Sequence, residues 1–187
     1  MSQTTLDIKE PGLNVLPPGV ERHVVNAGGL TGLQIFPDDE IEIINDEGNQ
    51  ICEIICFDKD GKSELGIINQ KENTKKSYIK EILKGKDESS LITNLQLKKR
   101  NLDINKSHSS ILFDDQTPSG EKIKIKSKDK CYVIFSAPQN DMLVSEQNPS
   151  SDITIFIKRS KIVNDKELSV IPDPVFEPNY EKNIDRQ

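Results

Sequence analysis

The sequence predicts a mainly β domain, a sandwich or barrel of about ten short strands with one or two short helices. Among its 187 residues are 24 Ile, 14 Leu and 9 Val but only 2 Ala, and branched aliphatic residues favour strands over helices. Several segments alternate apolar and polar residues with a period of two, as strands with one buried face do. Gly, Pro, Asn and Asp separate these segments at short intervals, which indicates turns.

The expected strands follow one another from residue 20 to residue 159. Their positions are residues 20–26, 32–36, 40–45, 50–57, 64–68, 108–113, 122–126, 131–137 and 152–159. In residues 122–126 and 152–159 the alternation is regular, so each strand turns one apolar face inward. The Lys side chains of residues 122–126 are typical of an exposed sheet edge.

The strongest pairing signal joins residues 40–45 to residues 50–57. Ile41 and Ile43 share one face of the first segment, and the Asp46-Glu47-Gly48-Asn49 connection contains a glycine that can take the positive φ of a tight turn. We therefore expect a hairpin here. Residues 50–57 are apolar on both faces around one charge, Glu53, which predicts a central strand covered on both sides.

A helix of about three turns is expected in the middle of the chain. Its apolar residues recur at helical spacing, namely Tyr78, Ile79, Ile82 and Leu83. Asn73 or Thr74 would cap the start of this helix, and Gly85 would end it. Residues 87–107, with Leu91, Leu95 and Leu97, fit either a strand or a short helix.

The chain divides into three parts by composition. Residues 1–19 form an extended leader that ends in Pro17-Pro18-Gly19, and residues 20–162 form the β domain. Residues 163–187 contain three closely spaced prolines, which predicts a Pro-rich linker or tail.

Charge and cysteine content exclude several classes of protein. The formal net charge is −6 and the pI is near 5.1, which argues against a nucleic-acid partner. No apolar run approaches the length of a membrane span, and the charged, proline-containing first twenty residues do not resemble a secretory signal. Three cysteines, an odd and sparse set, suit reduced thiols. We expect a cytoplasmic protein without a membrane partner.

Glu53 is the first candidate for a functional role. An ionised carboxylate within an apolar strand is costly unless it is paired or accepts hydrogen bonds. Either it lines a cavity as a functional group, or it is a structural residue at an edge or paired with Arg22, a Lys or a backbone N–H.

Metal ligands are sparse in this sequence. Cys52 and Cys56 lie on one face of a strand but ~13 Å apart, so they read as buried hydrophobes and not as a joint ligand pair. The only histidines are His23 and His108. These two residues and Cys131 are weak metal candidates, because no local spacing links them.

Part of the chain resembles the urea carboxylase-associated family. That family opens with a proline-containing strand and a glycine loop, followed by two hydrophobic strands around an Asp-x-x-Gly-x-Gln turn and then an acid and a Phe. Here the similar stretches are Val15 to Gly19, His23 to Gly28 and Glu40 to Phe57, in which Asp46, Gly48 (one position early), Gln50, Glu53 and Phe57 stand at the matching places.

The resemblance implies a role in guanidine or urea metabolism, or in a one-carbon or amine-catabolic protein. Such domains stand alone or precede aminomethyltransferase domains, and Pro172-Asp173-Pro174 with Asp185-Arg186 resembles the join between such modules. Stand-alone members that look catalytic carry a downstream His- and Cys-containing metal pattern, in place of which this chain has Ser107-His108-Ser109 and the distant Cys131. The resemblance therefore implies a non-catalytic module beside an aminomethyltransferase-type partner domain, which would hold the cofactor, tetrahydrofolate.

Two other functions stay open at this point. One is a small metal-dependent enzyme acting on an amidine or ureido compound; the other is an oligomerisation module, so that a homo-oligomer is also open. No catalytic or cofactor-binding residue is assigned to this domain. Asp46, Gln50 and Glu53 are the candidates for a binding surface.

Overall fold

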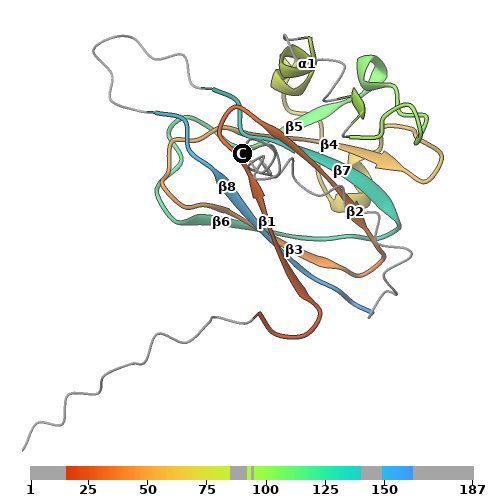
Figure 1. Ribbon diagram of the computed structural model, residues 1–187, viewed down its shortest axis with the longest axis horizontal. Helices are drawn as coiled ribbons and strands as arrows, with labels where there is room; N and C mark the ends of the chain where they lie inside the picture. Colours follow the sequence, from red (N-terminus) through yellow and green to blue (C-terminus); the bar gives the residue numbers. More distant parts are fainter. Residues whose placement is uncertain (1–15, 85–91, 94, 140–148, 162–187) are drawn as a thin grey trace, which may run out of the picture.

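The computed structural model describes residues 16–84, 92–93, 95–139 and 149–161. They form eight strands, one short α-helix and two 3₁₀ helices, η1 and η2 (Figure 1). In chain order these are β1 (Val20–Val25), β2 (Leu30–Ile35), β3 (Glu40–Asn45), β4 (Cys52–Asp58), η1 (Leu65–Ile68), α1 (Tyr78–Leu83), η2 (Ile104–Lys106), β5 (Ser109–Phe113), β6 (Glu121–Lys126), β7 (Cys131–Ser136) and β8 (Ile153–Lys158).

The strands build two antiparallel sheets of four strands each. Sheet A has the order β1-β8-β3-β6, and sheet B has the order β2-β7-β4-β5. Except for the step from β4 to β5, each connection crosses from one sheet to the other, and this order is that of an eight-stranded jelly roll. The predicted mainly β sandwich is confirmed, with eight strands in the described residues where about ten were expected.

The predicted hairpin between residues 40–45 and 50–57 is wrong. β3 pairs with β6 and β8 in sheet A, whereas β4 pairs with β5 and β7 in sheet B. The connection bonds to another loop instead of closing on itself, since the Asn49 N–H donates to the carbonyl of Thr117 (2.7 Å) and the Gly120 N–H to that of Asn45 (2.7 Å). Turn residues signal a change of direction equally well for a hairpin and for a corner between two sheets.

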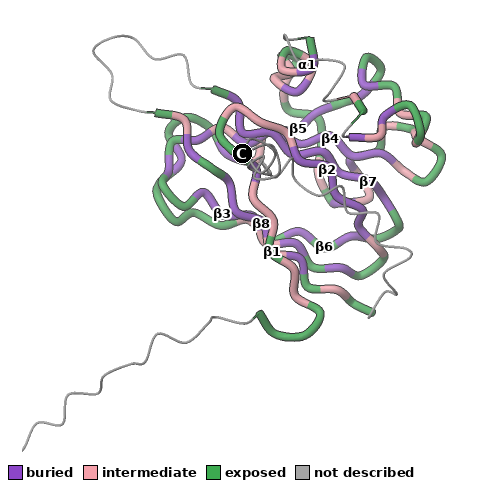
Figure 2. The backbone as a smooth tube through the Cα atoms, viewed as in Figure 1, coloured by how far each residue is buried: buried purple, intermediate pink, exposed green. Residues whose placement is uncertain are grey.

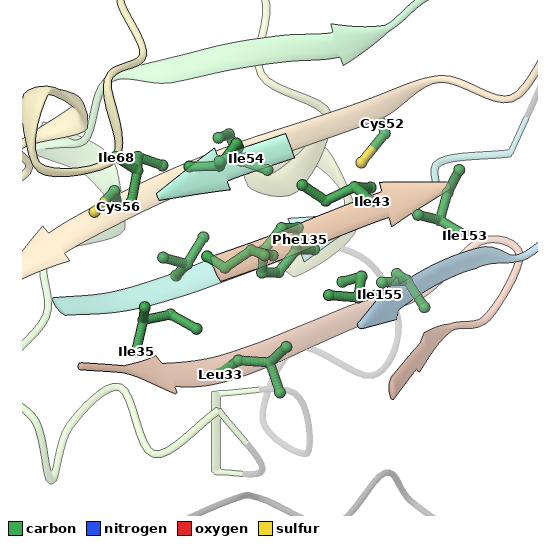
Figure 3. Close-up of a cluster of buried hydrophobic side chains, with 14 of the residues drawn as sticks. Leu33, Ile35, Ile43, Cys52, Ile54, Cys56, Ile68, Phe135, Ile153 and Ile155 are labelled. Atoms are coloured by element: carbon green, nitrogen blue, oxygen red, sulfur yellow. The ribbon is translucent and has the colours of Figure 1, made fainter. Parts of the chain in front are cut away.

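The core lies between the two sheets and is built mainly from aliphatic residues, with three cysteines and two phenylalanines among them. Figure 3 shows side chains of both sheets meeting in this space, with Phe135 close to Ile43 and Ile155. All three are at most 1% exposed. The predicted alternation is confirmed, because Ile153, Ile155 and Ile157 all belong to this cluster. Buried residues follow the strands of both sheets, while the connecting loops are largely exposed (Figure 2).

The outer face of sheet B is also covered. Ile55 and Phe57 of β4 and Tyr132 and Ile134 of β7 form a second apolar cluster with residues of α1, of the segment before η2 and of η2 itself. These are Ile79, Leu83, Leu95, Leu97 and Ile104. The expectation that β4 is central and apolar on both faces is therefore confirmed. Gly32 is required at this interface, because a Cβ there would collide with the Tyr132 hydroxyl.

Three local expectations need correction. Residues 65–68 form η1 instead of a strand, because Glu64 caps the Gly66 N–H (3.0 Å) and Asn69 ends the turn at a φ of 55°. The N-cap of α1 is Ser77, whereas Asn73 exchanges two hydrogen bonds (2.7 and 2.9 Å) with the backbone of Ile111 at the edge of β5. The helix is six residues long, shorter than the three turns expected.

One of the expected domain boundaries lies within the described residues. A turn closed by the Val20 N–H and the Pro17 carbonyl (3.0 Å) leads directly into β1, at the expected start of the domain. Residues 1–15, Gly85 and the expected tail of residues 163–187 lie outside the described residues. In the described part of the chain, no helix has the length and apolar character needed to cross a membrane.

Candidate functional site

Gln50 joins three strand ends at one end of the sandwich. Its side chain is fully buried, and its amide nitrogen donates to the carbonyls of Ile51 and Pro138, both at 2.9 Å. Its amide oxygen accepts the backbone N–H of Ser151 at 2.8 Å. Gln50 therefore holds the start of β4 against the end of β7 and the approach to β8, and both its amide nitrogen and its amide oxygen have partners within the protein.

Asp46 lies beside this cluster but at the surface. One carboxylate oxygen accepts a hydrogen bond from the Thr154 hydroxyl at 2.7 Å, and its backbone carbonyl accepts one from the Ser119 hydroxyl at 2.6 Å. Of the three residues predicted to form a binding surface, Asp46 alone is exposed, because Gln50 and Glu53 are fully buried.

Two buried oxygens at the same end have no hydrogen-bond partner. Asn45 donates its amide N–H to the carbonyl of Gln50 (2.8 Å), but its amide oxygen is unpartnered, as is the hydroxyl of Ser151. Buried polar atoms in native proteins nearly always bond to protein or to ordered water. Neither residue was expected from the sequence to be functional, although Asn45 continues the inward register of Ile41 and Ile43, where a polar residue is unexpected.

Glu53 connects β4 to α1. It lies on the outer face of sheet B, fully buried, and one carboxylate oxygen accepts the backbone N–H of Ile79 in the first turn of the helix at 2.7 Å. Its other carboxylate oxygen has no partner. A backbone N–H, one of the structural partners expected for Glu53, is thus present, whereas Arg22 lies on the outer face of sheet A.

The weak metal candidates lie in three different places. His23 is on β1 and contacts Glu21 (3.0 Å), while His108 precedes β5, is exposed and contacts Glu72 (3.0 Å). Cys131 starts β7 and is buried in the core, 3.6 Å from the Ser127 hydroxyl. Within the residues that the structure describes, no three His, Cys, Asp or Glu side chains are grouped so that they could hold a metal ion.

The cysteines behave as core residues. Burial raises the pKa of the Cys52 thiol far above its ordinary value. A hydrogen bond to Cys131, together with burial, raises the pKa of Cys56. Both therefore stay as neutral thiols, and the prediction that Cys52 and Cys56 are buried hydrophobes is confirmed.

A charged cluster closes the opposite end of the sandwich. The Arg159 guanidinium is 4% exposed and donates two hydrogen bonds to Glu21, each 2.7 Å, and one to Asp39 at 2.7 Å. Asp39 is fully buried and also accepts the N–H groups of Phe36 (3.0 Å) and Ser160 (2.9 Å). Because Arg159 continues the inward register of β8, the same register argument could have found it in the sequence.

Glu21 is the residue of this cluster with the largest electrostatic change. Burial alone would raise its pKa, but the hydrogen bonds from His23 and Arg159 outweigh burial and lower the pKa to about 2. Burial likewise opposes the charge of Arg159, while Glu21 and Asp39 restore it and raise its pKa. The cluster therefore links β1, β8 and the start of β3 through charged groups that are paired with one another.

Comparison with known proteins connects the chain to one larger enzyme. No protein-family model matches the chain. Over 171 residues, 91% of this chain, it is 31% identical to a trimethylamine-oxide aldolase of Ruegeria pomeroyi. The matched stretch is 22% of that enzyme, so the chain spans about a fifth of the relative's length. The likeness does not by itself identify the urea carboxylase-associated family; what it establishes is that this β sandwich is similar to one part of a larger amine-oxide aldolase.

Proposed function

We propose that this chain is a non-catalytic jelly-roll domain of an amine-catabolic protein, working beside a tetrahydrofolate-dependent aminomethyltransferase-type domain. The observation that carries the proposal is the 31% identity, over nearly the whole chain, to a fifth of a trimethylamine-oxide aldolase. Because the match covers so small a share of the enzyme, the rest of the enzyme is available to supply the enzyme's chemistry.

The packing of the interior supports the non-catalytic role. A jelly roll that binds a small molecule between its sheets needs space there. Here Phe135, Ile43, Ile155 and their neighbours fill that space, and the polar groups at both ends of the core hold strands together. In this proposal the folate therefore belongs to the partner domain, and the urea carboxylase-associated resemblance describes the module itself.

A domain exchange tests the proposal. The matched stretch of the Ruegeria pomeroyi aldolase is replaced by this chain, and consumption of trimethylamine oxide is compared for the hybrid, for this chain alone and for the parent enzyme. We expect activity in the hybrid and the parent and none in the isolated chain. A hybrid that folds, as judged by circular dichroism and gel filtration, but is inactive would contradict the proposed role.

Elemental analysis of the purified chain tests the metal-dependent alternative. Stoichiometric zinc that is lost in His108→Ala, together with turnover of an amidine or ureido compound by the isolated chain, would overturn the proposal in favour of an enzyme. His23→Ala is the matched variant, since His23 also contacts one carboxylate but lies on another strand. We expect both variants and the parent chain to contain no stoichiometric metal.

A further inference from the structure

β5 forms one edge of sheet B. It lies at the end of the strand order, beside β4 (Figure 1), and no other strand of the described residues pairs with its far side. A row of main-chain N–H and C=O groups at such an edge is a template on which another chain can pair. The sequence of β5, Ser-Ser-Ile-Leu-Phe, contains no charged residue, proline or glycine that would discourage this pairing.

A side chain takes the place of a neighbouring strand at the middle of β5. The amide nitrogen of Asn73 donates to the carbonyl of Ile111 (2.9 Å), and the N–H of Ile111 donates to the amide oxygen of Asn73 (2.7 Å). An antiparallel strand makes the same two bonds, because residues of a hydrogen-bonded pair exchange both N–H···O=C contacts. The Asn73 amide therefore imitates one residue of a β ladder.

Asn73 belongs to the strap, by which we mean residues 69–77, the connection from η1 to α1. Buried residues of η1 and of α1 fix the two ends of the strap, but none of its own residues is buried. Polar contacts hold its middle beside β5, namely Asn73 with Ile111 and Glu72 with His108 (3.0 Å). A segment held by a few exposed hydrogen bonds opens at low cost, so the Asn73 contact can be displaced.

Two of the other three edge strands are protected by different means. β6 carries Lys122, Lys124 and Lys126 on one side, and two antiparallel copies of β6 paired about Lys124 would place like charges opposite one another. On β2 the carbonyl of Gln34 is already bound by the guanidinium of Arg159 at 2.9 Å. β5 has no such charge in its own sequence, so its protection depends on a residue outside the strand.

The β5 edge is compatible with pairing to a second copy of itself. In an antiparallel pair centred on Ile111, the two Ile111 residues would exchange both of their main-chain bonds. All residues of β5 are uncharged, so no like charges meet, and the pair closes as a two-fold dimer. The main-chain groups at the centre of this pair are the two that Asn73 occupies.

We propose that Asn73 is an edge guard, which blocks self-pairing of this chain through β5. The strap keeps the Asn73 amide at the middle of the edge, and a second copy can pair there only by displacing it. The contact is therefore an autoinhibitory device built into the fold. This inference goes beyond the proposed function, because it concerns association of the chain with itself and not the chemistry of a partner domain.

Sedimentation velocity of the whole chain, over a range of concentrations, tests the proposal. We expect the parent chain to stay monomeric and Asn73→Ala to form a dimer. Its association constant should rise roughly ten- to thirtyfold, because two hydrogen bonds no longer compete with the second copy. Asn105→Ala is the matched control and should stay monomeric, since Asn105 is an exposed Asn of η2 whose hydrogen bonds in the described structure are made by its main chain.

Hydrogen exchange at the Ile111 amide identifies the edge that pairs. In the parent chain this amide is bonded to Asn73 and should exchange slowly at every concentration. In Asn73→Ala it should exchange rapidly in dilute solution and slowly again as the dimer forms, which a mere loss of stability would not produce. Asn73→Ala/Ile111→Pro removes the N–H from this edge and should return the chain to a monomer.

Four results would overturn the edge-guard proposal. They are an Asn73→Ala chain that folds and stays monomeric, a parent chain that already dimerises through β5, equal association of Asn105→Ala, and a dimer in which the Ile111 amide stays unprotected. Circular dichroism checks that each variant folds, and Asn73→Ala changes an exposed side chain. If Asn73→Ala/Ile111→Pro does not fold, the exchange of the Ile111 amide in Asn73→Ala decides the question.

Discussion

Glu21 should control the acid sensitivity of this fold. Its carboxylate accepts both hydrogen bonds of the Arg159 fork (2.7 Å each) and one from His23 (3.0 Å), which lowers its pKa to about 2 from an ordinary value of 4.5. Replacing it by Gln removes the negative charge and leaves the buried guanidinium, among the described residues, with the single carboxylate of Asp39.

The pKa change sets the size of the effect. At about 1.4 kcal/mol for each pKa unit, the carboxylate contributes about 3 kcal/mol to the free energy of unfolding. Its side chain is 24% exposed, so solvent screening reduces this to about 2 kcal/mol. Because the folded pKa is lowered, the contribution is fully present above pH 4.5 and is lost as the pH falls toward 2.

Urea denaturation followed by far-ultraviolet circular dichroism measures this effect. At pH 7 we expect Glu21→Gln to lower the free energy of unfolding by about 2 kcal/mol, and the gap to the parent chain to close as the pH approaches 2. Glu81→Gln is the control, since Glu81 is 57% exposed and lies 3.9 Å from its partner Lys76. A gap that is the same at pH 7 and at low pH would refute the electrostatic explanation.

Three further predictions concern the buried interfaces. Glu53→Ala should lower the free energy of unfolding by about 2–3 kcal/mol, because the buried N–H of Ile79 loses its acceptor; Glu53→Gln keeps an acceptor and should cost less, and equal losses would contradict this role. Gly32→Ala should cost about 1–3 kcal/mol through its collision with Tyr132, and much less in a Tyr132→Leu background; no rescue there would contradict the steric cause. The three buried cysteines should react with a thiol reagent only in denaturant; rapid labelling of the folded chain would show that the core opens.

The strand positions could be predicted because they depend on local pattern. Alternation in residues 40–45, 122–126 and 152–159 reports which side chains face inward, and the structure places β3, β6 and β8 there. The pairing of β3 with β6 and β8 could not be read in the same way, since their partners lie far away in sequence. Alternation assigns a face to a residue without stating which strand lies beside it.

The candidate site was predicted less completely than the fold. Glu53 was selected because a carboxylate in an apolar strand needs a partner, and the backbone N–H of Ile79 is that partner. Gln50 was selected from a resemblance but is buried and serves three strand ends. Arg159 and Asn45 were missed, although each continues an apolar register at a strand end, because the sequence does not state where the core stops.

By itself, the sequence determined that this chain is a β protein with aliphatic sheet faces, an acidic surface overall and few metal ligands. Those properties follow from residue type and local periodicity, which act over a few residues. The tertiary structure alone decided that the sheets form a jelly roll, that the ends of the core are closed by Arg159 and by Gln50, and that Asn73 lies against the edge of β5. These features depend on pairings between distant segments, whose energies come from contacts that exist only once the chain has folded.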